Sequence, residues 1–247
     1  AAALNALLGT GTVQVVRAGD TLHITGLGAA SLTVNDVNLD NPLAVAVRRS
    51  GIAYSGIEVL NVDLGSGDDV VNVRGTTAVT NLFGHAGNER WYVSSLASET
   101  LASAQTTDLL LGNLDDLLGN LSIDAGAGRH KLFVSDEAAV VGDPSVSITD
   151  SPASATRLPG SEIEISGLAP AAIDYQAGAT GNFADGITVW SGYGNDTITV
   201  DGTHERAGVR TITSLNTGLG DDTVTVKLTV GQDGFFALDT QGPYDQF

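Results

Sequence analysis

The sequence predicts an all-β protein, an elongated parallel β-solenoid (β-helix) whose turns carry Gly-x-Gly-Asp motifs. Three observations support this fold class. The chain has 31 glycines in 247 residues and only two lysines, a composition typical of strands and turns rather than helices. Short segments alternate apolar and polar residues, and one turn motif recurs along the chain. With 42% hydrophobic residues and no cysteine, such a chain can bury a sizeable core but gains nothing from disulfides.

Strands are expected where β-branched residues alternate with polar ones. The predicted strands are 13–16, 21–25, 31–35, 58–63, 70–73, 145–149, 187–190, 197–200, 211–215 and 223–228. Residues 95–121 break this pattern because they are rich in leucine at irregular spacing. We expect a helical turn or two there, capping or covering the solenoid, with Thr107 or Asn113 as N-cap.

The recurring turn consists of Gly-x-Gly, a polar or acidic pair and an alternating strand. Three copies are close to one another, at residues 64–73, 191–200 and 217–226, and two more at 84–93 and 125–134 keep the shape but lose the paired acids. The second glycines are residues 67, 87, 128, 194 and 220. Their spacings of 20, 41, 66 and 26 are close to multiples of about 22, which suits one coil of a β-solenoid. Tandem β-sandwich domains are the alternative, although their turns should recur at shorter intervals and need share no motif.

A longer repeat overlies the short one. Ile24-Thr-Gly-Leu-Gly28 resembles Ile165-Ser-Gly-Leu-Ala169, and the turns at Gly67 and Gly194 are each followed by a similar strand end. We therefore expect two diverged units, residues 1–133 and 134–247, in one continuous solenoid. Residues 151–160 are expected to form a surface excursion.

The formal charge of −18 restricts the partners. It repels nucleic acid and anionic lipid, and it favours divalent cations, calcium first. No run of 18 apolar residues is present, so we expect no membrane insertion. Residues 1–8 are too short and lack the basic flank of a signal peptide, so we expect the chain to begin as a mature or excised piece.

At the Gly-x-Gly-Asp-Asp turns the sequence resembles the calcium-binding nonapeptides of repeats-in-toxin proteins. It resembles more closely the repeat arrays of very large bacterial cell-surface proteins that are often labelled calcium-binding or adhesin-like. The most specific segment is residues 52–69, and residues 233–242 are a second one. The resemblance covers most of residues 50–93 and 160–247. It implies a secreted module at the cell surface or outside the cell, not an enzyme.

Calcium prefers six to eight oxygen ligands, and glycine allows a turn to direct its carbonyls inward. By the resemblance, Asp69, Asp196 and Asp222 match the acidic position of the nonapeptide. The accompanying candidates are the carbonyls of Gly65, Gly67, Gly192, Gly194, Gly218 and Gly220, with Asp68, Asn195 and Asp221 as secondary ligands. Unlike tandem nonapeptides, these turns lie about 20 or more residues apart. Only two pairs of turns are therefore expected to meet: the turn at Gly194 with the turn at Gly220, and the turn at Gly67 with the turn at Gly87.

The simpler interpretation is that Gly-Asp-Asp only forms a good turn, since glycine supplies positive φ and Asp hydrogen-bonds to the backbone. Arg129 and His130 stand at the paired position in one copy, so the turn can exist without an ion.

Motifs for catalysis are missing from the sequence. The four histidines lie outside metal-ligand spacing, and no Gly-x-Ser-x-Gly elbow or Walker loop is present. Carbohydrate binding by an adhesin module is the main alternative function, with Trp91, Trp190 and Tyr193 as stacking candidates. A polysaccharide-acting β-helix enzyme and a Thr-x-Thr ice-binding or mineral-binding face are further alternatives.

The sequence therefore predicts a structural, calcium-associated repeat module, a stalk or self-associating filament of an extracellular bacterial surface protein. The strand edges at the ends of a solenoid tend to pair with other chains unless they are capped or already occupied by a partner. We expect end-to-end contact with copies of the chain or with adjoining repeats, and extracellular glycans as the alternative partners.

Overall fold

The computed structural model describes residues 14–18, 21–25, 52–97, 110–151, 158–242 and 245–246. This part of the chain is all-β and contains no helix. The predicted strand at 31–35 lies outside the described residues. The strands are β1 (Gln14–Ala18), β2 (Thr21–Thr25), β3 (Val59–Asp63), β4 (Val70–Val73), β5 (Val79–Phe83), β6 (Arg90–Val93), β7 (Leu121–Asp124), β8 (Lys131–Ser135), β9 (Val146–Thr149), β10 (Ile163–Ser166), β11 (Ile173–Gln176), β12 (Ile187–Trp190), β13 (Thr197–Val200), β14 (Ile212–Asn216), β15 (Thr223–Val226) and β16 (Phe235–Asp239).

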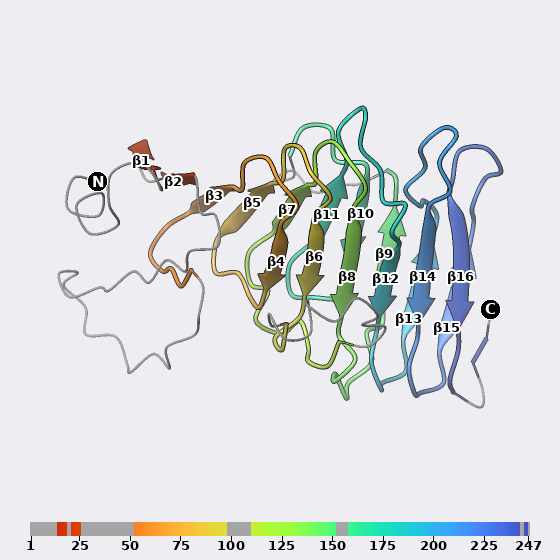
Figure 1. The fold of residues 1–247 in the computed structure, drawn as a ribbon. Coiled ribbons are helices and arrows are strands. Elements are labelled where there is room, and N and C mark those ends of the chain that lie inside the picture. The colour runs from red at the N-terminus through yellow and green to blue at the C-terminus, as the bar shows by residue number, and fades with distance from the viewer. Residues whose placement is uncertain are drawn as a thin grey trace.

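The strands form two facing sheets, in which they lie side by side along the molecule (Figure 1). The ten-stranded sheet has the order β1-β2-β3-β5-β7-β11-β10-β9-β13-β15, and the six-stranded sheet has the order β16-β14-β12-β8-β6-β4. Pairing is parallel throughout the six-stranded sheet. In the ten-stranded sheet it is antiparallel only where β1 meets β2 and where β10 meets β9 and β11. These parallel sheets are compatible with a β-solenoid.

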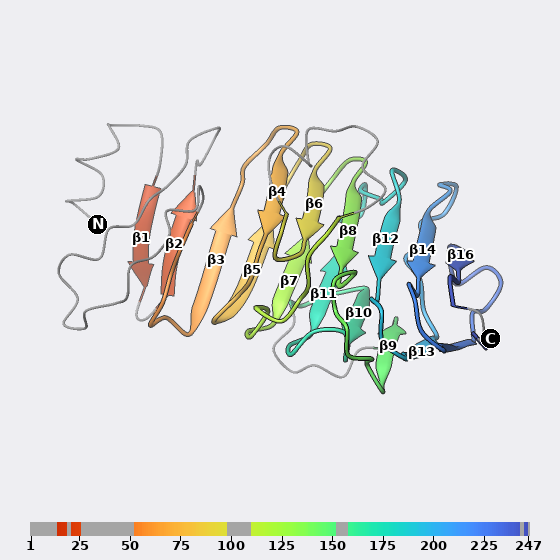
Figure 2. The same cartoon turned by 90° about the horizontal axis from the view of Figure 1, so that it is seen from below.

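The chain alternates between the sheets, and we call one strand of the ten-stranded sheet plus the following strand of the six-stranded sheet a circuit (Figure 2). Circuits are formed by β3–β4, β5–β6, β7–β8, β11–β12, β13–β14 and β15–β16. The link inside a circuit defines the first corner, and the link to the next circuit defines the second corner. After β8 the chain adds β9, then returns through the antiparallel β10 to β11, which pairs with β7.

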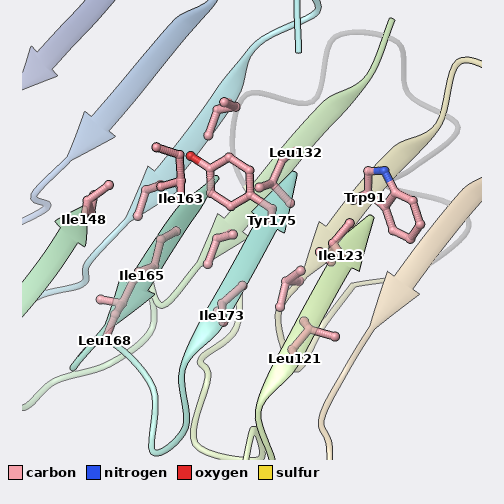
Figure 3. Close-up of a cluster of buried hydrophobic side chains, with 14 of the residues drawn as sticks. Trp91, Leu121, Ile123, Leu132, Ile148, Ile163, Ile165, Leu168, Ile173 and Tyr175 are labelled. Carbon is pink, nitrogen blue, oxygen red and sulfur yellow. The ribbon is translucent and has the colours of Figure 1, made fainter. Parts of the chain in front are cut away.

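The main core fills the space between the sheets. Figure 3 shows Trp91, Leu121, Leu132 and Tyr175 among its fully buried side chains. Apolar burial of this kind contributes roughly 1.5–3 kcal/mol for each large aliphatic side chain. In strands such as β3 and β5 the burial alternates, as expected when one face covers the core and the other meets solvent.

A second, smaller core lies on the outer side of the six-stranded sheet. Tyr92 and Phe133 stack there with ring centroids 6.4 Å apart, and Ala97, Leu110 and Trp190 pack with them. The leucine-rich segment therefore does cover the sheet, through Ala97 and Leu110. The predicted helical turn is wrong for residues 95–97 and 110–121, which carry a bend, turns and a bridge instead. Asn113 donates from Nδ2 to Asp115 Oδ2, and Thr107 lies outside the described residues.

Several strands escaped the sequence prediction. These are β5, β6, β7, β8, β10, β11 and β16. The predicted boundary between residues 133 and 134 falls inside β8, and β8 pairs with both β6 and β12. The described residues include no helix long and apolar enough to span a membrane.

Candidate functional site: links stacked at two corners

Three links stack on one another at the first corner: Gly-x-Gly at residues 65–67 and 126–128, and His-Ala-Gly at residues 85–87. The Gly67 N–H donates to the Ala86 carbonyl at 2.8 Å, and the Gly87 N–H donates to the Ala127 carbonyl at 3.0 Å. Parallel bridges join Ser66 to Ala86 and Ala86 to Ala127. The expected meeting of the turns at 67 and 87 is therefore confirmed, and the 128 link joins them.

Glycine is needed at this corner for two reasons. Gly65 and Gly67 have φ values of +87° and +136°, which L-residues with side chains rarely adopt. At Gly128, φ is +135°, and a Cβ atom would lie 1.7 Å from the Gly87 carbonyl oxygen. The links therefore stack closely because their second glycines leave no side chain between them.

His85 takes the place that Gly65 and Gly126 occupy in the neighbouring links. It has φ of +63° and is the only non-glycine residue with positive φ in the described part of the chain. Its Nε2 contacts the Asp63 carboxylate on the solvent-facing side. This contact accompanies a backbone conformation that costs a non-glycine residue roughly 1–2 kcal/mol.

A column of ionisable side chains lies inside the first corner. Glu89, which stands where Asp69 stands one circuit earlier, is fully buried, and His130 of the next circuit is fully buried beside it. His130 Nδ1 lies 2.7 Å from Glu89 Oε2, and His130 Nε2 lies 3.2 Å from the Gly126 carbonyl oxygen. Burial raises the pKa of Glu89 to about 7 and lowers the pKa of His130. Both shifts favour a pair without net charge, in which the Glu89 carboxylic acid donates to His130 Nδ1.

The column continues through an aromatic contact to a second buried histidine. The Phe183 ring packs edge-on against His130 and His204, with centroids 5.6 Å and 5.0 Å away. His204 Nδ1 lies 2.6 Å from Glu162 Oε2, and Arg206 binds Glu162 Oε1 at 2.6 Å. Burial opposes ionisation of Glu162, but the hydrogen bonds from His204 and Arg206 outweigh it and lower its pKa. Glu162, at this end of the column, therefore favours its ionised form, whereas Glu89 favours its neutral form.

The Gly-x-Gly-Asp links of the second half stack at the opposite, second corner. Here a Cβ atom on Gly218 would lie 1.7 Å from the Gly192 carbonyl oxygen, and one on Gly220 would lie 2.4 Å from the Gly194 carbonyl oxygen. The predicted meeting of the turns at 194 and 220 is therefore confirmed. The same local motif thus serves both corners.

The acidic residues of the second corner join successive circuits. Asp196 Oδ1 accepts the Asp143 N–H at 2.7 Å, and Asp222 Oδ1 accepts the Asp196 N–H at 2.8 Å. Asp245 Oδ1 continues the row by accepting the Asp222 N–H at 3.1 Å. Ser191 Oγ donates to the remaining oxygen of Asp196. Under the simpler interpretation these aspartates only stabilise their own turns, but Asp196 and Asp222 are buried and accept N–H groups of the preceding circuit.

Burial of these carboxyl groups disfavours their ionised forms. It raises the pKa of Asp196 and of Asp222, and in each case a neighbouring aspartate adds to the shift. Burial also raises the pKa of Asp136 to about 7 and that of Asp143 to about 6, with Coulombic repulsion from nearby aspartates as a further cause. Asp136, with a pKa of about 7, is therefore only partly ionised near pH 7.

The predicted calcium ligands are divided between the corners. Gly65, Gly67, Asp68 and Asp69 lie at the first corner, and Gly192, Gly194, Asn195, Asp196, Gly218, Gly220, Asp221 and Asp222 lie at the second. Asp68 Oδ1 accepts the Asn88 N–H, and Asn195 Oδ1 accepts the Asp221 N–H. No group of three or more His, Asp and Glu side chains in the described residues is placed to hold a metal ion. At both corners these side-chain oxygens accept backbone N–H groups of neighbouring circuits.

The three aromatic candidates for sugar stacking have different environments. Trp91 is fully buried in the main core, and Trp190 is half-buried against the second core. Tyr193 alone is exposed, with 43% of its surface accessible, and its hydroxyl donates to Glu137 Oε1 at 2.6 Å.

Sequence reasoning missed Glu89, His130, Asp136 and Asp143. Glu89 could have been found, because it aligns with Asp69 in the repeat. Asp136 and Asp143 lie in a link without the Gly-x-Gly motif, so only the stacking of circuits reveals them.

Comparisons with protein-family models, with curated proteins and with solved structures found no match to this chain.

Proposed function

We propose that the chain is a β-solenoid that serves as a structural, calcium-associated repeat module of an extracellular bacterial surface protein. In this role it acts as a stalk or a self-associating filament. Parallel pairing of strands from successive circuits supports the solenoid over tandem β-sandwich domains, in which antiparallel strands dominate. The extracellular setting and the bacterial source rest on the resemblance of the turns alone.

One observation carries the structural role: contacts of the same kind join successive circuits. Glycine stacks on carbonyl in three links at the first corner and in two at the second, and Asp196, Asp222 and Asp245 each accept a backbone N–H from the preceding circuit. A structure joined by such repeating contacts can be extended without a new kind of interface.

The last circuit retains the features needed for such extension. In the described part of the chain β16 pairs only with β14. Phe236 and Leu238 of this strand are only partly buried, as is Leu228 in the preceding link. An edge strand with unpaired backbone groups and apolar side chains is a template for pairing with another strand. We propose that an adjoining repeat or a second copy covers this edge.

The association is tested by light scattering of the intact chain over a range of concentrations, with calcium and with chelator. We expect elongated assemblies whose mass rises with concentration. Phe236→Asp combined with Leu238→Asp should reduce this association, because it places charges on the open edge. Leu118→Asp is the matched control, since Leu118 is 62% exposed in the link before β7. A monodisperse monomer under all conditions contradicts the proposal.

Calcium association is tested separately by calorimetric titration of the metal-stripped protein. We expect heat of binding and a higher melting temperature, both reduced in Asp222→Asn, because the acidic second corner has charge to neutralise. Absence of both signals removes calcium from the proposal and leaves the carboxylates as backbone acceptors.

A further inference from the structure

The second corner carries a contiguous row of exposed apolar side chains, which we call the apolar edge: Val140, Val141, Tyr193 and Leu219. Their exposed fractions are 78%, 76%, 43% and 49%. The Tyr193 N–H donates to the Ala139 carbonyl, and the glycines flanking Leu219 stack on those flanking Tyr193. The four side chains therefore stand on three adjacent links. Contiguous exposed apolar surface of this kind marks interaction sites.

The first corner lacks such a row, although its links have the same design. The central residues of its three stacked links are Ser66, Ala86 and Ala127. The turn geometry therefore does not require a large apolar residue at this position. Large residues at the second corner need another explanation, which contact with a partner supplies.

The charge around the apolar edge selects the partner. Residues 110–118, 136–145, 191–197 and 217–223 contain eight acidic residues and no Lys, Arg or His. In the described residues the links of the second corner carry one cation, Arg74, whose Nε donates to the Ser95 carbonyl. Among them Asp115, Asp116 and Asp221 are exposed. Six of the eleven Lys and Arg residues of the chain lie at the first corner instead, in its links or at the start of the strand that follows: Arg90, Arg129, Lys131, Arg206, Arg210 and Lys227. A partner for the second corner must supply positive charge as well as apolar side chains.

We propose that the apolar edge and its acidic border form a docking surface for a basic, amphipathic polypeptide segment. The segment would place apolar side chains on Val140, Val141 and Leu219 and basic side chains on Asp115, Asp116 and Asp221. Tyr193 is a preorganised anchor, because hydrogen bonds hold both its backbone N–H and its hydroxyl. This contact is lateral and goes beyond the proposed end-to-end role, since it uses neither β16 nor calcium.

Other occupants fit the charge less well. An anionic membrane surface is repelled by a chain of net charge −18. A second copy carries the same net charge and brings its own acidic borders to the contact.

The test uses the intact chain and a labelled synthetic peptide of alternating Lys and Val as the probe, followed by fluorescence anisotropy. A Lys/Ser peptide removes the apolar face, and a Glu/Val peptide reverses the charge. We expect binding of the Lys/Val peptide only, weakened at high salt. Tyr193→Ser and Leu219→Ser should each weaken it about tenfold or more, and Asp221→Asn combined with Asp115→Asn should reduce its salt dependence.

Val230→Ser is the matched control, because Val230 is fully exposed in the first-corner link between β15 and β16. This substitution should leave peptide binding unchanged. Equal binding of the Lys/Ser peptide, or no binding of the Lys/Val peptide, overturns the proposal. So does binding to uncharged lipid vesicles that Leu219→Ser abolishes, or self-association that Leu219→Ser abolishes and Phe236→Asp does not. These last results would identify a membrane or a second copy as the occupant.

Discussion

The two corners of the molecule are built from the same local motif, but they handle charge differently. At the first corner Glu89 meets a buried histidine, and Glu162 meets a histidine and an arginine. At the second corner the buried carboxylates of Asp196 and Asp222 meet backbone N–H groups and each other's charge. The comparison teaches that Gly-x-Gly provides the turn, while the residues after it determine how successive circuits are joined.

The corners should be equally intolerant of side chains on their stacked glycines. Gly128→Ala and Gly218→Ala each place a Cβ atom 1.7 Å from a backbone oxygen at positive φ. We expect each to lower the free energy of unfolding by more than about 3 kcal/mol, measured by urea denaturation. Gly65→Ala is the control, because its φ is +87° but no atom lies within 4 Å. It should cost only about 1 kcal/mol, and a cost as large as that of Gly128→Ala would show that φ alone matters.

Removing an acidic side chain should cost more unfolding free energy at the second corner than at the first. Asp196→Ala leaves the Asp143 N–H without its side-chain acceptor and removes one of the two acceptors of the buried Ser191 hydroxyl, which also contacts the Thr217 carbonyl. We expect a loss of about 2–3 kcal/mol of unfolding free energy, measured in chelator so that no metal contributes. Asp68→Ala at the first corner removes an acceptor of the Asn88 N–H in solvent and should cost less than about 1 kcal/mol. Equal losses of unfolding free energy would contradict the distinction between buried acceptors at the second corner and solvent-exposed acceptors at the first.

The neutral form of Glu89 at the first corner should appear in the pH dependence of stability. The folded-state pKa of Glu89 is raised to about 7, above its usual 4.5, so its contribution is present below pH 4.5 and is lost as pH rises through 7. Glu89→Gln keeps a neutral side chain that can still donate to His130. Relative to the wild type it should be more stable at pH 8 than at pH 5, by about 1–2 kcal/mol. A difference independent of pH would show that Glu89 is not neutral in the folded state.

The smallest expected effect concerns His85, the one described link residue with a side chain at strained φ. His85→Gly should raise the unfolding free energy by about 0.5–1 kcal/mol, because glycine adopts φ of +63° without strain and the lost contact to Asp63 is exposed. Thermal and urea unfolding of the two proteins measure this difference in unfolding free energy. A net loss of stability would mean that the contact with Asp63 outweighs the backbone strain.

The sequence predicted the bounds of four strands as the structure has them: β2, β4, β12 and β13. In β13 the reason is clear, because the buried Ile198 and Val200 alternate with less buried threonines. In β6 and β8 the alternation is lost, since Tyr92 and Phe133 are buried in the second core beneath residues 97 and 110. Covering of the outer face by a distant segment cannot be read from a local pattern.

The candidate site was predicted only in its local parts. The Gly-x-Gly turns follow from the sequence, because glycine adopts positive φ without the strain that a side chain causes. The paired acids were identified as candidate ligands, but their hydrogen bonds to neighbouring circuits were not. Asp196 and Asp222 are 26 residues apart, and their contact depends on how many residues each circuit contains.

By itself the sequence determined that this protein is made of strands and glycine turns and that its surface is strongly acidic. The tertiary structure decided which corner each turn occupies, because the same local geometry can lead from either sheet to the other. It also decided which acids are buried and that Glu89 meets His130, 41 residues later. Those contacts arise from the stacking of circuits, including the antiparallel detour through β10, and no short-range pattern encodes that stacking.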